Sequence, residues 1–133
     1  MIARVQLWGR TIGAVALEEG REVAAFQYDP AFAGSGIELS PLTMPLSTQV
    51  YEFPALPRTT FHGLPGLLAD SLPDKFGNAL IDAWLATQGR TPENFNAVER
   101  LCYMSCLKLT QRDTRYPEKA GCNRSMCAFL GAI

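Results

Sequence analysis

Three short strands are predicted within residues 3–28, which read ARVQLWGRTIGAVALEEGREVAAFQY. Each is a run of five or six residues rich in Val, Ile, Phe or Tyr, and turns at Gly9-Arg10 and Glu19-Gly20 separate the runs. Short runs joined by tight Gly-containing turns are typical of an antiparallel meander. The three predicted strands cover residues 3–8, 13–17 and 23–28.

The chain that follows this meander is predicted to be less regular. Residues 30–32 fit a single helical turn, and Gly34-Ser35-Gly36 is interpreted as a flexible connector, because no Gly-Lys-Ser/Thr ending of a phosphate-binding loop follows it. Residues 37–46 are predicted to be extended and to lie at a sheet edge, where the missing amide hydrogens of Pro41 and Pro45 are tolerated.

From Thr59 onward the spacing of apolar residues becomes helical, and about three helices are predicted. The second begins at Ser71-Leu72-Pro73-Asp74, where a hydroxyl group, a first-turn proline and a carboxylate coincide, and it ends at Gly89. The third begins at Thr91-Pro92-Glu93. The sequence therefore predicts an α+β fold, with a small antiparallel sheet of three to five short strands followed by about three helices.

Each predicted helix carries one apolar face. Trp84 is assigned to the core, whereas Phe76 is left open between a core position and an exposed aromatic anchor for a partner. The predicted buried faces are Phe61, Leu64, Leu67 and Leu68 in the first helix; Phe76, Leu80, Ala83 and Trp84, with Ile81 and Leu85 as further candidates, in the second; and Phe95, Val98, Leu101 and Cys102 in the third.

The composition fits one globular domain that is neither disordered nor membrane-spanning. Of the 133 residues, 47% are hydrophobic and 19% are charged, and no apolar run approaches the roughly 18 to 20 residues of a membrane span. The net charge of −1 provides no field that would attract nucleic acid. We therefore expect a cytoplasmic protein with no direct contact to nucleic acid or membrane.

Charge and cysteine content divide the chain into two parts. Residues 1–104 contain seven Arg or Lys and eleven Asp or Glu, a net charge of −4, whereas residues 105–133 have a net charge of +3. Periodicity weakens beyond Met104. We therefore predict a domain over residues 1–104 and a divergent, poorly ordered tail over residues 105–133.

Few side chains in the sequence are candidates for catalysis or metal binding. His62 is the only histidine and is interpreted as a surface or capping residue at a helix start. Asp70 and Asp74 are four residues apart, a spacing that suits metal ligands or an acid/base pair, but carboxylates are also favoured at helix starts. The spacing of the cysteines departs from that of zinc knuckles, so reduced thiols are favoured for Cys102, Cys106, Cys122 and Cys127. We expect no catalytic residue, no metal site and no cofactor.

Residues 61–77, FHGLPGLLADSLPDKFG, carry a resemblance to a known family. The string resembles the signature of the HipA N-terminal domain, in which a leucine-rich turn leads into a Leu-Pro-Asp motif, an aromatic residue and a helix. The segments around Tyr28 and from Ile37 to Leu46 are similar to the family in order and spacing. The resemblance covers residues 1 to about 104, and the tail from Ser105 matches no family pattern.

The resemblance implies a bacterial toxin–antitoxin system. Members of this family are serine/threonine kinases that carry the domain ahead of the ATP-binding and catalytic elements. Their usual partner is a helix-turn-helix antitoxin. The resemblance therefore implies a non-catalytic interaction domain that packs on, or counteracts, a HipA-type kinase domain in cis or in trans. The alternative is a truncated or frameshifted relic of a full kinase without independent activity. The candidate partner-binding residues are Leu72, Asp74, Lys75 and Phe76.

Overall fold

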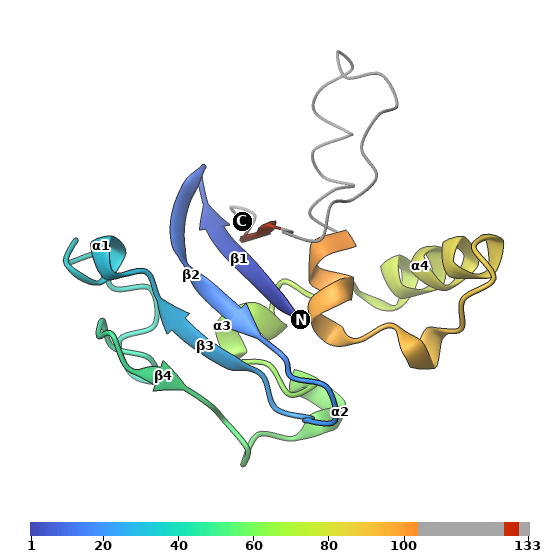
Figure 1. The fold of residues 1–133 in the computed structure, drawn as a ribbon, viewed down its shortest axis with the longest axis horizontal. Coiled ribbons are helices and arrows are strands. Elements are labelled where there is room, and N and C mark those ends of the chain that lie inside the picture. The colour runs from blue at the N-terminus through green and yellow to red at the C-terminus, as the bar shows by residue number, and fades with distance from the viewer. Residues whose placement is uncertain (104–126, 131–133) are drawn as a thin grey trace.

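The computed structural model describes residues 1–103 and 127–130. Its sheet has the strand order β4-β3-β2-β1-β5 (Figure 1). Strands β1 to β4 are antiparallel neighbours, and β5 pairs parallel with β1. The strands are β1 (Ile2–Leu7), β2 (Arg10–Ala16), β3 (Ala25–Tyr28), β4 (Val50–Tyr51) and β5 (Cys127–Leu130). With its helices, this sheet confirms the predicted α+β class and the antiparallel meander.

The turn between β1 and β2 lies one residue earlier than predicted. Leu7 pairs with Arg10, so the two-residue loop is Trp8-Gly9, with φ angles of 50° and 77°. Two positive φ angles define the type I′ hairpin turn, whose twist matches that of paired strands. Trp8 is thereby held in the left-handed region, where non-glycine residues are uncommon, and its side chain is 80% exposed.

The prediction of an extended edge segment over residues 37–46 is wrong, because the edge strand lies elsewhere in the chain. Residues 41–43 form a turn that is closed by an isolated bridge between Ser40 and Met44. The antiparallel edge strand is β4, further along the chain, and it pairs with β3. Pro41 and Pro45, which favoured an edge strand, instead interrupt this segment. The single helical turn α1 (Pro30–Ala33) forms where it was predicted, and the Asp29 side chain caps it.

The first predicted helix is two separate turns, α2 (Arg58–Phe61) and α3 (Gly66–Ala69). Pro65 precedes α3, and His62 ends α2 with a φ of 52°, so the prediction of His62 at a helix start is wrong. A continuous helix through this segment is prevented because Pro65 cannot donate a backbone hydrogen bond and Gly63 adopts a φ of 77°.

The remaining helices are α4 (Lys75–Thr87), the short 3-10 helix η1 (Pro92–Asn94) and a helix over residues 97–103. The predicted start of the third helix at Thr91 is therefore wrong. The side chains of Asn96 and Glu99 instead exchange hydrogen bonds of 2.9 Å with each other's backbone N–H groups, which is a reciprocal cap. This cap begins a new helix after the η1 turn.

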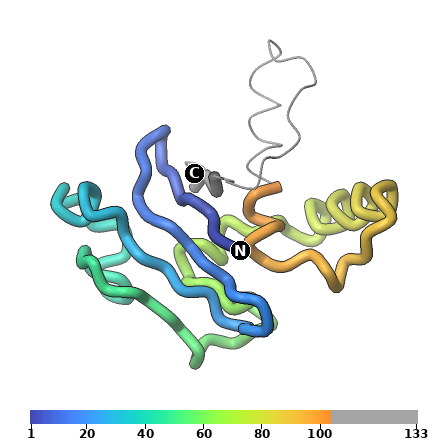
Figure 2. Tube along the Cα trace, viewed as in Figure 1, coloured from blue at the N-terminus to red at the C-terminus, as the bar shows by residue number. Residues whose placement is uncertain are grey.

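One face of the sheet is buried and the other is open. Alternate strand residues such as Val5, Val15 and Phe26 are completely buried, while Arg4 and Gln27 between them face solvent. The opposing layer of the core includes Leu64, Leu68, Val98, Leu101 and Cys102. Figure 2 places the N-terminus beside the start of the helix over residues 97–103, consistent with a 3.9 Å contact between the Asn96 amide and the Met1 sulfur.

Tyr28 lies at the centre of an aromatic group on the same buried face. Its ring stacks on Phe32 and makes edge contacts with Phe26 and Tyr51, and its hydroxyl donates a 2.9 Å hydrogen bond to the Met44 carbonyl. Burial, and to a lesser degree Tyr51 and Glu38, raises the pKa of this phenol above its ordinary value of about 10. The bond to Met44 holds the irregular segment after α1 against the sheet.

Candidate functional site: the outer face of α4

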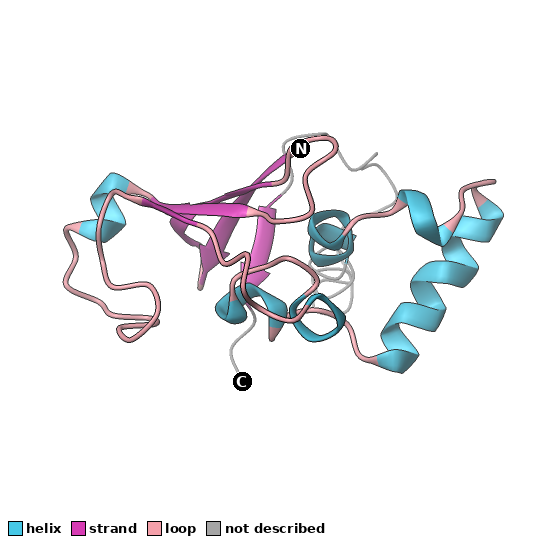
Figure 3. Ribbon diagram, turned by 90° about the horizontal axis from the view of Figure 1, so that it is seen from below, coloured by secondary structure: helices cyan, strands magenta, loops and turns pink. Residues whose placement is uncertain are grey.

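Helix α4 lies at the opposite end of the molecule from α1, away from the sheet (Figures 1 and 3). Its buried side comprises Gly77, Ile81 and Leu85. Ile81 and Leu85 form a small core with Phe95, and Tyr103 packs against it. This second core is separate from the one beneath the sheet, so α4 is held by η1 and by the helix over residues 97–103.

The opposite side of α4 is apolar and exposed. We call it the α4 face; it consists of Phe76, Ala79, Leu80, Ala83 and Trp84. Phe76 is 72% exposed, Leu80 is 49% exposed and Trp84 is 36% exposed. Large hydrophobic residues are usually found inside folded proteins, and a contiguous exposed group of them marks an interaction surface.

The α4 face corrects the prediction of which side of this helix is buried. Leu80, Ala83 and Trp84 were expected in the core, but the structure buries the two further candidates, Ile81 and Leu85. Trp84 is only partly covered, by Tyr103 at a ring separation of 4.7 Å and by Phe95 at 6.4 Å. Of the two options left open for Phe76, the structure selects the exposed position.

Both ends of α4 are defined by local hydrogen bonds. The Asp74 carboxylate accepts a 2.8 Å bond from the Gly77 N–H and caps the first turn. At the other end the Gly89 and Arg90 N–H groups bond to the carbonyls of Ala86 and Leu85, which is a Schellman motif with Gly89 in the left-handed region. The predicted stop at Gly89 is confirmed, whereas the predicted start at Ser71 is three residues early.

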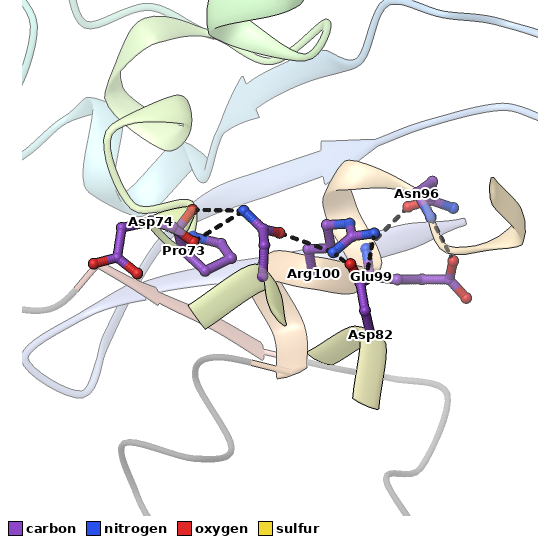
Figure 4. A network of polar contacts seen from close by, with 7 residues as sticks. Pro73, Asp74, Asp82, Asn96, Glu99 and Arg100 are labelled. Carbon is purple, nitrogen blue, oxygen red and sulfur yellow. Dashed lines mark hydrogen bonds and ion pairs between the residues drawn. The ribbon is translucent and has the colours of Figure 1, made fainter. Parts of the chain in front are cut away.

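A polar clasp attaches α4 to the helix over residues 97–103 (Figure 4). The Arg100 guanidinium donates to Asn78 Oδ1 at 2.8 Å and to Asp82 Oδ1 at 3.3 Å, and Arg100 is only 18% exposed. The Asn78 amide in turn donates to the carbonyls of Pro73 and Asp74. Because the clasp and the small core hold the inner side of α4, the outer side remains open.

The predicted partner-binding residues divide between two environments. Asp74, Lys75 and Phe76 are all exposed at the start of α4. Leu72 is partly buried and packs against the core beneath the sheet. The structure therefore brings Asp74, Lys75 and Phe76 together at the start of α4, where Phe76 belongs to the α4 face, and packs Leu72 against the main core.

A groove of about 560 Å³ lies on the inner side of this region. Arg58, paired with Glu22, and Arg100, paired with Asp82, both line it, together with His62. Since each arginine already has an acidic partner, the groove has no unbalanced charge to attract an ionic ligand.

The other candidate chemical groups are dispersed. Asp70 ends α3 and Asp74 begins α4, so the two carboxylates do not share a helical face as was considered from their spacing. Within residues 1–103 and 127–130 no cluster of three or more His, Cys, Asp or Glu side chains is placed to hold a metal ion. Cys102 is buried in the main core, while Cys106 and Cys122 lie outside the described residues.

The sequence did contain a signal for the α4 face. Between Lys75 and Thr87 the only other charged residue is Asp82, so apolar residues extend almost completely around the helix. A helix that is apolar on all sides is usually buried on all sides. Within the described residues, other parts of the chain cover only one side of α4.

These features define a class of protein: a small α+β domain that presents one uncovered apolar side of a helix. No helix among the described residues is long and apolar enough to cross a membrane. A family model for the HipA N-terminal domain matches residues 3–106, and the chain belongs to this family. The match does not extend to a kinase region, and the family supports a HipA-type toxin–antitoxin context. Searches of curated proteins and of solved structures returned no match.

Proposed function

We propose that this chain is a non-catalytic interaction domain that packs through the α4 face on a HipA-type serine/threonine kinase domain. The single observation that carries the proposal is the exposed apolar stripe on α4, whose opposite side is already occupied by the small core. The kinase domain is supplied either by another chain or by further sequence of the same protein. A helix-turn-helix antitoxin is a second proposed partner, and the compartment is the cytoplasm.

Phe76 is the proposed anchor of this contact. It is the most exposed large residue of the stripe and lies in the first turn of α4, beside Asp74 and Lys75. Aromatic side chains that become fully buried at the centre of an interface dominate binding energy, while charged residues at the rim contribute little. We therefore assign the affinity to Phe76 and leave Asp74 and Lys75 to orient the partner.

Replacing Phe76 by alanine should weaken binding to the cognate kinase domain by about 2 kcal/mol or more, roughly 30-fold. The free energy of unfolding should change by less than about 1 kcal/mol, since the side chain is 72% exposed in the free domain. Calorimetric titration against the kinase domain and denaturant unfolding measure the two effects. Val50→Ala is the matched control, because Val50 is 56% exposed on the distant strand β4. If Phe76→Ala binds as tightly as Val50→Ala, the proposed anchor is wrong.

Residues 1–104 are proposed to form the folding unit. In the part of the chain whose burial is described, residues 1–103, both cores are already extensive, with buried members from Ala3 to Cys102. Removing residues 105–133 should therefore leave a domain that still unfolds cooperatively, although β1 loses its pairing with β5. Circular dichroism during denaturant unfolding of the truncated and full chains is the measurement, and a truncated chain without a cooperative transition would show that the tail belongs to the folding unit.

The alternative to a dedicated partner is a relic of a full-length kinase with no independent activity. The change of composition after Met104 supports this second candidate, because net charge reverses from −4 to +3 across it. The DNA sequence downstream of the gene separates the two. A kinase reading frame that resumes after a shift of one or two bases favours the relic, and a complete separate kinase gene favours the dedicated partner.

A further inference from the structure

Arg100 lines the groove on the inner side of α4 and bonds to the beginning of that helix, where Phe76 is exposed on the other side. We propose that Arg100 is a positioning residue for the contact with the kinase domain. It fixes the first turn of α4 before the partner binds, although it does not belong to the α4 face. This role rests on the proposed function and adds to it a residue that lies outside the contact.

The bonds run from Arg100 to the start of α4 in two steps (Figure 4). The Arg100 guanidinium donates to Asn78 Oδ1 at 2.8 Å, and the Asn78 amide nitrogen donates to the carbonyls of Pro73 and Asp74 at 3.0 and 3.1 Å. A guanidinium carries only donors, so it holds the Asn78 oxygen toward itself and leaves the amide N–H groups for the two carbonyls. Without Arg100, the amide that ties the start of α4 to its first turn would lose this constraint.

Phe76 depends on the first turn because it is 72% exposed, so its direction follows from the backbone that carries it rather than from packing. The small core contacts α4 further along, at Ile81 and Leu85. Ile81 is already five residues beyond Phe76, which is more than one helical turn. Binding costs less free energy when a contact residue is ordered beforehand. The clasp at Asn78 is therefore well placed to prepare Phe76 for the partner.

The surroundings of Arg100 favour one fixed geometry. Its side chain is 18% exposed, its guanidinium carbon lies 5.7 Å from the centre of the Phe95 ring, and both Nη atoms donate to Asp82 Oδ1 at 3.3 Å. A planar guanidinium that is stacked on a ring and shared between two acceptors is held more firmly than an exposed ion pair. Arg90 also stacks on Phe95, at 5.3 Å, but it is 43% exposed and pairs with Glu99, outside α4.

A double-mutant cycle in the full chain tests this role. Calorimetric titration gives the affinity of the kinase domain for Arg100→Met, once with Phe76 present and once with Phe76→Ala. Arg100→Met should weaken binding about fivefold or more with Phe76 present, and less than about twofold with alanine there, because its effect passes through Phe76. Arg90→Met is the matched control and should weaken binding less than about twofold in both backgrounds. Equal losses from Arg100→Met in both backgrounds would mean that Arg100 only holds the fold, and would overturn the inference.

Asn78→Asp is the second variant, which serves if Arg100→Met lowers the stability of the domain. Its carboxylate keeps an acceptor for Arg100 and suits the start of a helix, but it cannot donate to the carbonyls of Pro73 and Asp74. We expect weaker kinase binding that again depends on Phe76, with no loss of resistance to denaturant. Kinase binding as tight as that of the unchanged chain would show that the link from Arg100 to the first turn has no part in recognition.

Hydrogen exchange in the free domain tests the positioning without the kinase domain. The Gly77 N–H bonds to the Asp74 carboxylate and the Asn78 N–H bonds to the Asp74 carbonyl, so both amides report on the first turn. Arg100→Met should accelerate exchange at these two amides more than at the amides in the last turn of α4. A uniform change along α4, or none, would contradict the positioning role.

Failure of this role is distinguishable from failure of the proposed function. Kinase binding that Phe76→Ala leaves intact overturns the proposed function, and hydrogen exchange in the free domain still decides whether Arg100 fixes the first turn. Binding that Phe76→Ala weakens, with equal losses from Arg100→Met in both backgrounds, overturns the positioning role and leaves the proposed function standing.

Discussion

Replacing Gly63 by alanine is expected to destabilise the domain by about 3 kcal/mol or more, because strain and a steric clash coincide. Gly63 has a φ of 77°, a conformation that residues with a side chain rarely adopt. A β-carbon at this position would also collide with the backbone carbonyl of Glu22. The clash is with backbone, so no side-chain rotation can relieve it.

The effect is large because Gly63 joins two parts of the fold. Its carbonyl accepts a 2.8 Å hydrogen bond from the Ala24 N–H, immediately before β3. The Arg58 guanidinium also donates to the Glu22 carbonyl and pairs with the Glu22 carboxylate at 3.4 Å. Moving Gly63 away from Glu22 would therefore loosen the attachment of α2 to the sheet.

Gly20→Ala is the matched control for this prediction. Gly20 has a φ of 80°, but no atom lies within 4 Å of the position that its β-carbon would take. Only backbone strain remains, and it should cost about 1 kcal/mol. Denaturant unfolding of both variants gives the comparison. Equal losses for Gly20→Ala and Gly63→Ala would mean that the close approach to Glu22 contributes nothing.

Replacing Leu85 by alanine is expected to cost about 2 to 5 kcal/mol of unfolding free energy. Leu85 is completely buried in the small core that holds α4. The substitution removes apolar contacts with Ile81 and Phe95 and leaves a cavity in a core with few other members. Because this core is separate from the one beneath the sheet, the first consequence should be loss of protection of α4 amides from hydrogen exchange.

Leu80→Ala is the control on the same helix. Leu80 and Leu85 have the same side chain, but Leu80 is 49% exposed, so its removal should cost less than about 1 kcal/mol. Denaturant unfolding measures both variants, and hydrogen exchange locates the loss. If Leu80→Ala is as destabilising as Leu85→Ala, then both sides of α4 are packed in the free domain and the α4 face is not available to a partner.

The meander and the end of α4 could be predicted because their causes are local. Alternation of polarity in β1 to β3 depends on neighbouring residues, and Gly9, Gly20 and Gly89 supply positive φ angles at the turns and at the end of α4. The apolar face of the helix over residues 97–103 was also predicted correctly, since Val98, Leu101 and Cys102 are the buried residues of that segment. The segment at Thr91 also resembled a helix start, but it is exposed and uncapped. The helix begins instead at the reciprocal cap formed by Asn96 and Glu99.

Only the tertiary structure decided which side of α4 is buried. Both sides are apolar in the sequence, so periodicity could not distinguish Ile81 and Leu85 from Leu80 and Trp84. The choice depends on partners distant in the chain. Phe95 and Tyr103 cover Ile81 and Leu85 and partly cover Trp84, and Arg100 reaches Asn78 and Asp82 from a separate helix. The sequence by itself thus determined the first three strands, the end of α4 at Gly89 and the family. Long-range packing decided which side of α4 is exposed, because the burial of a side chain depends on the surface that packs against it as well as on its own segment.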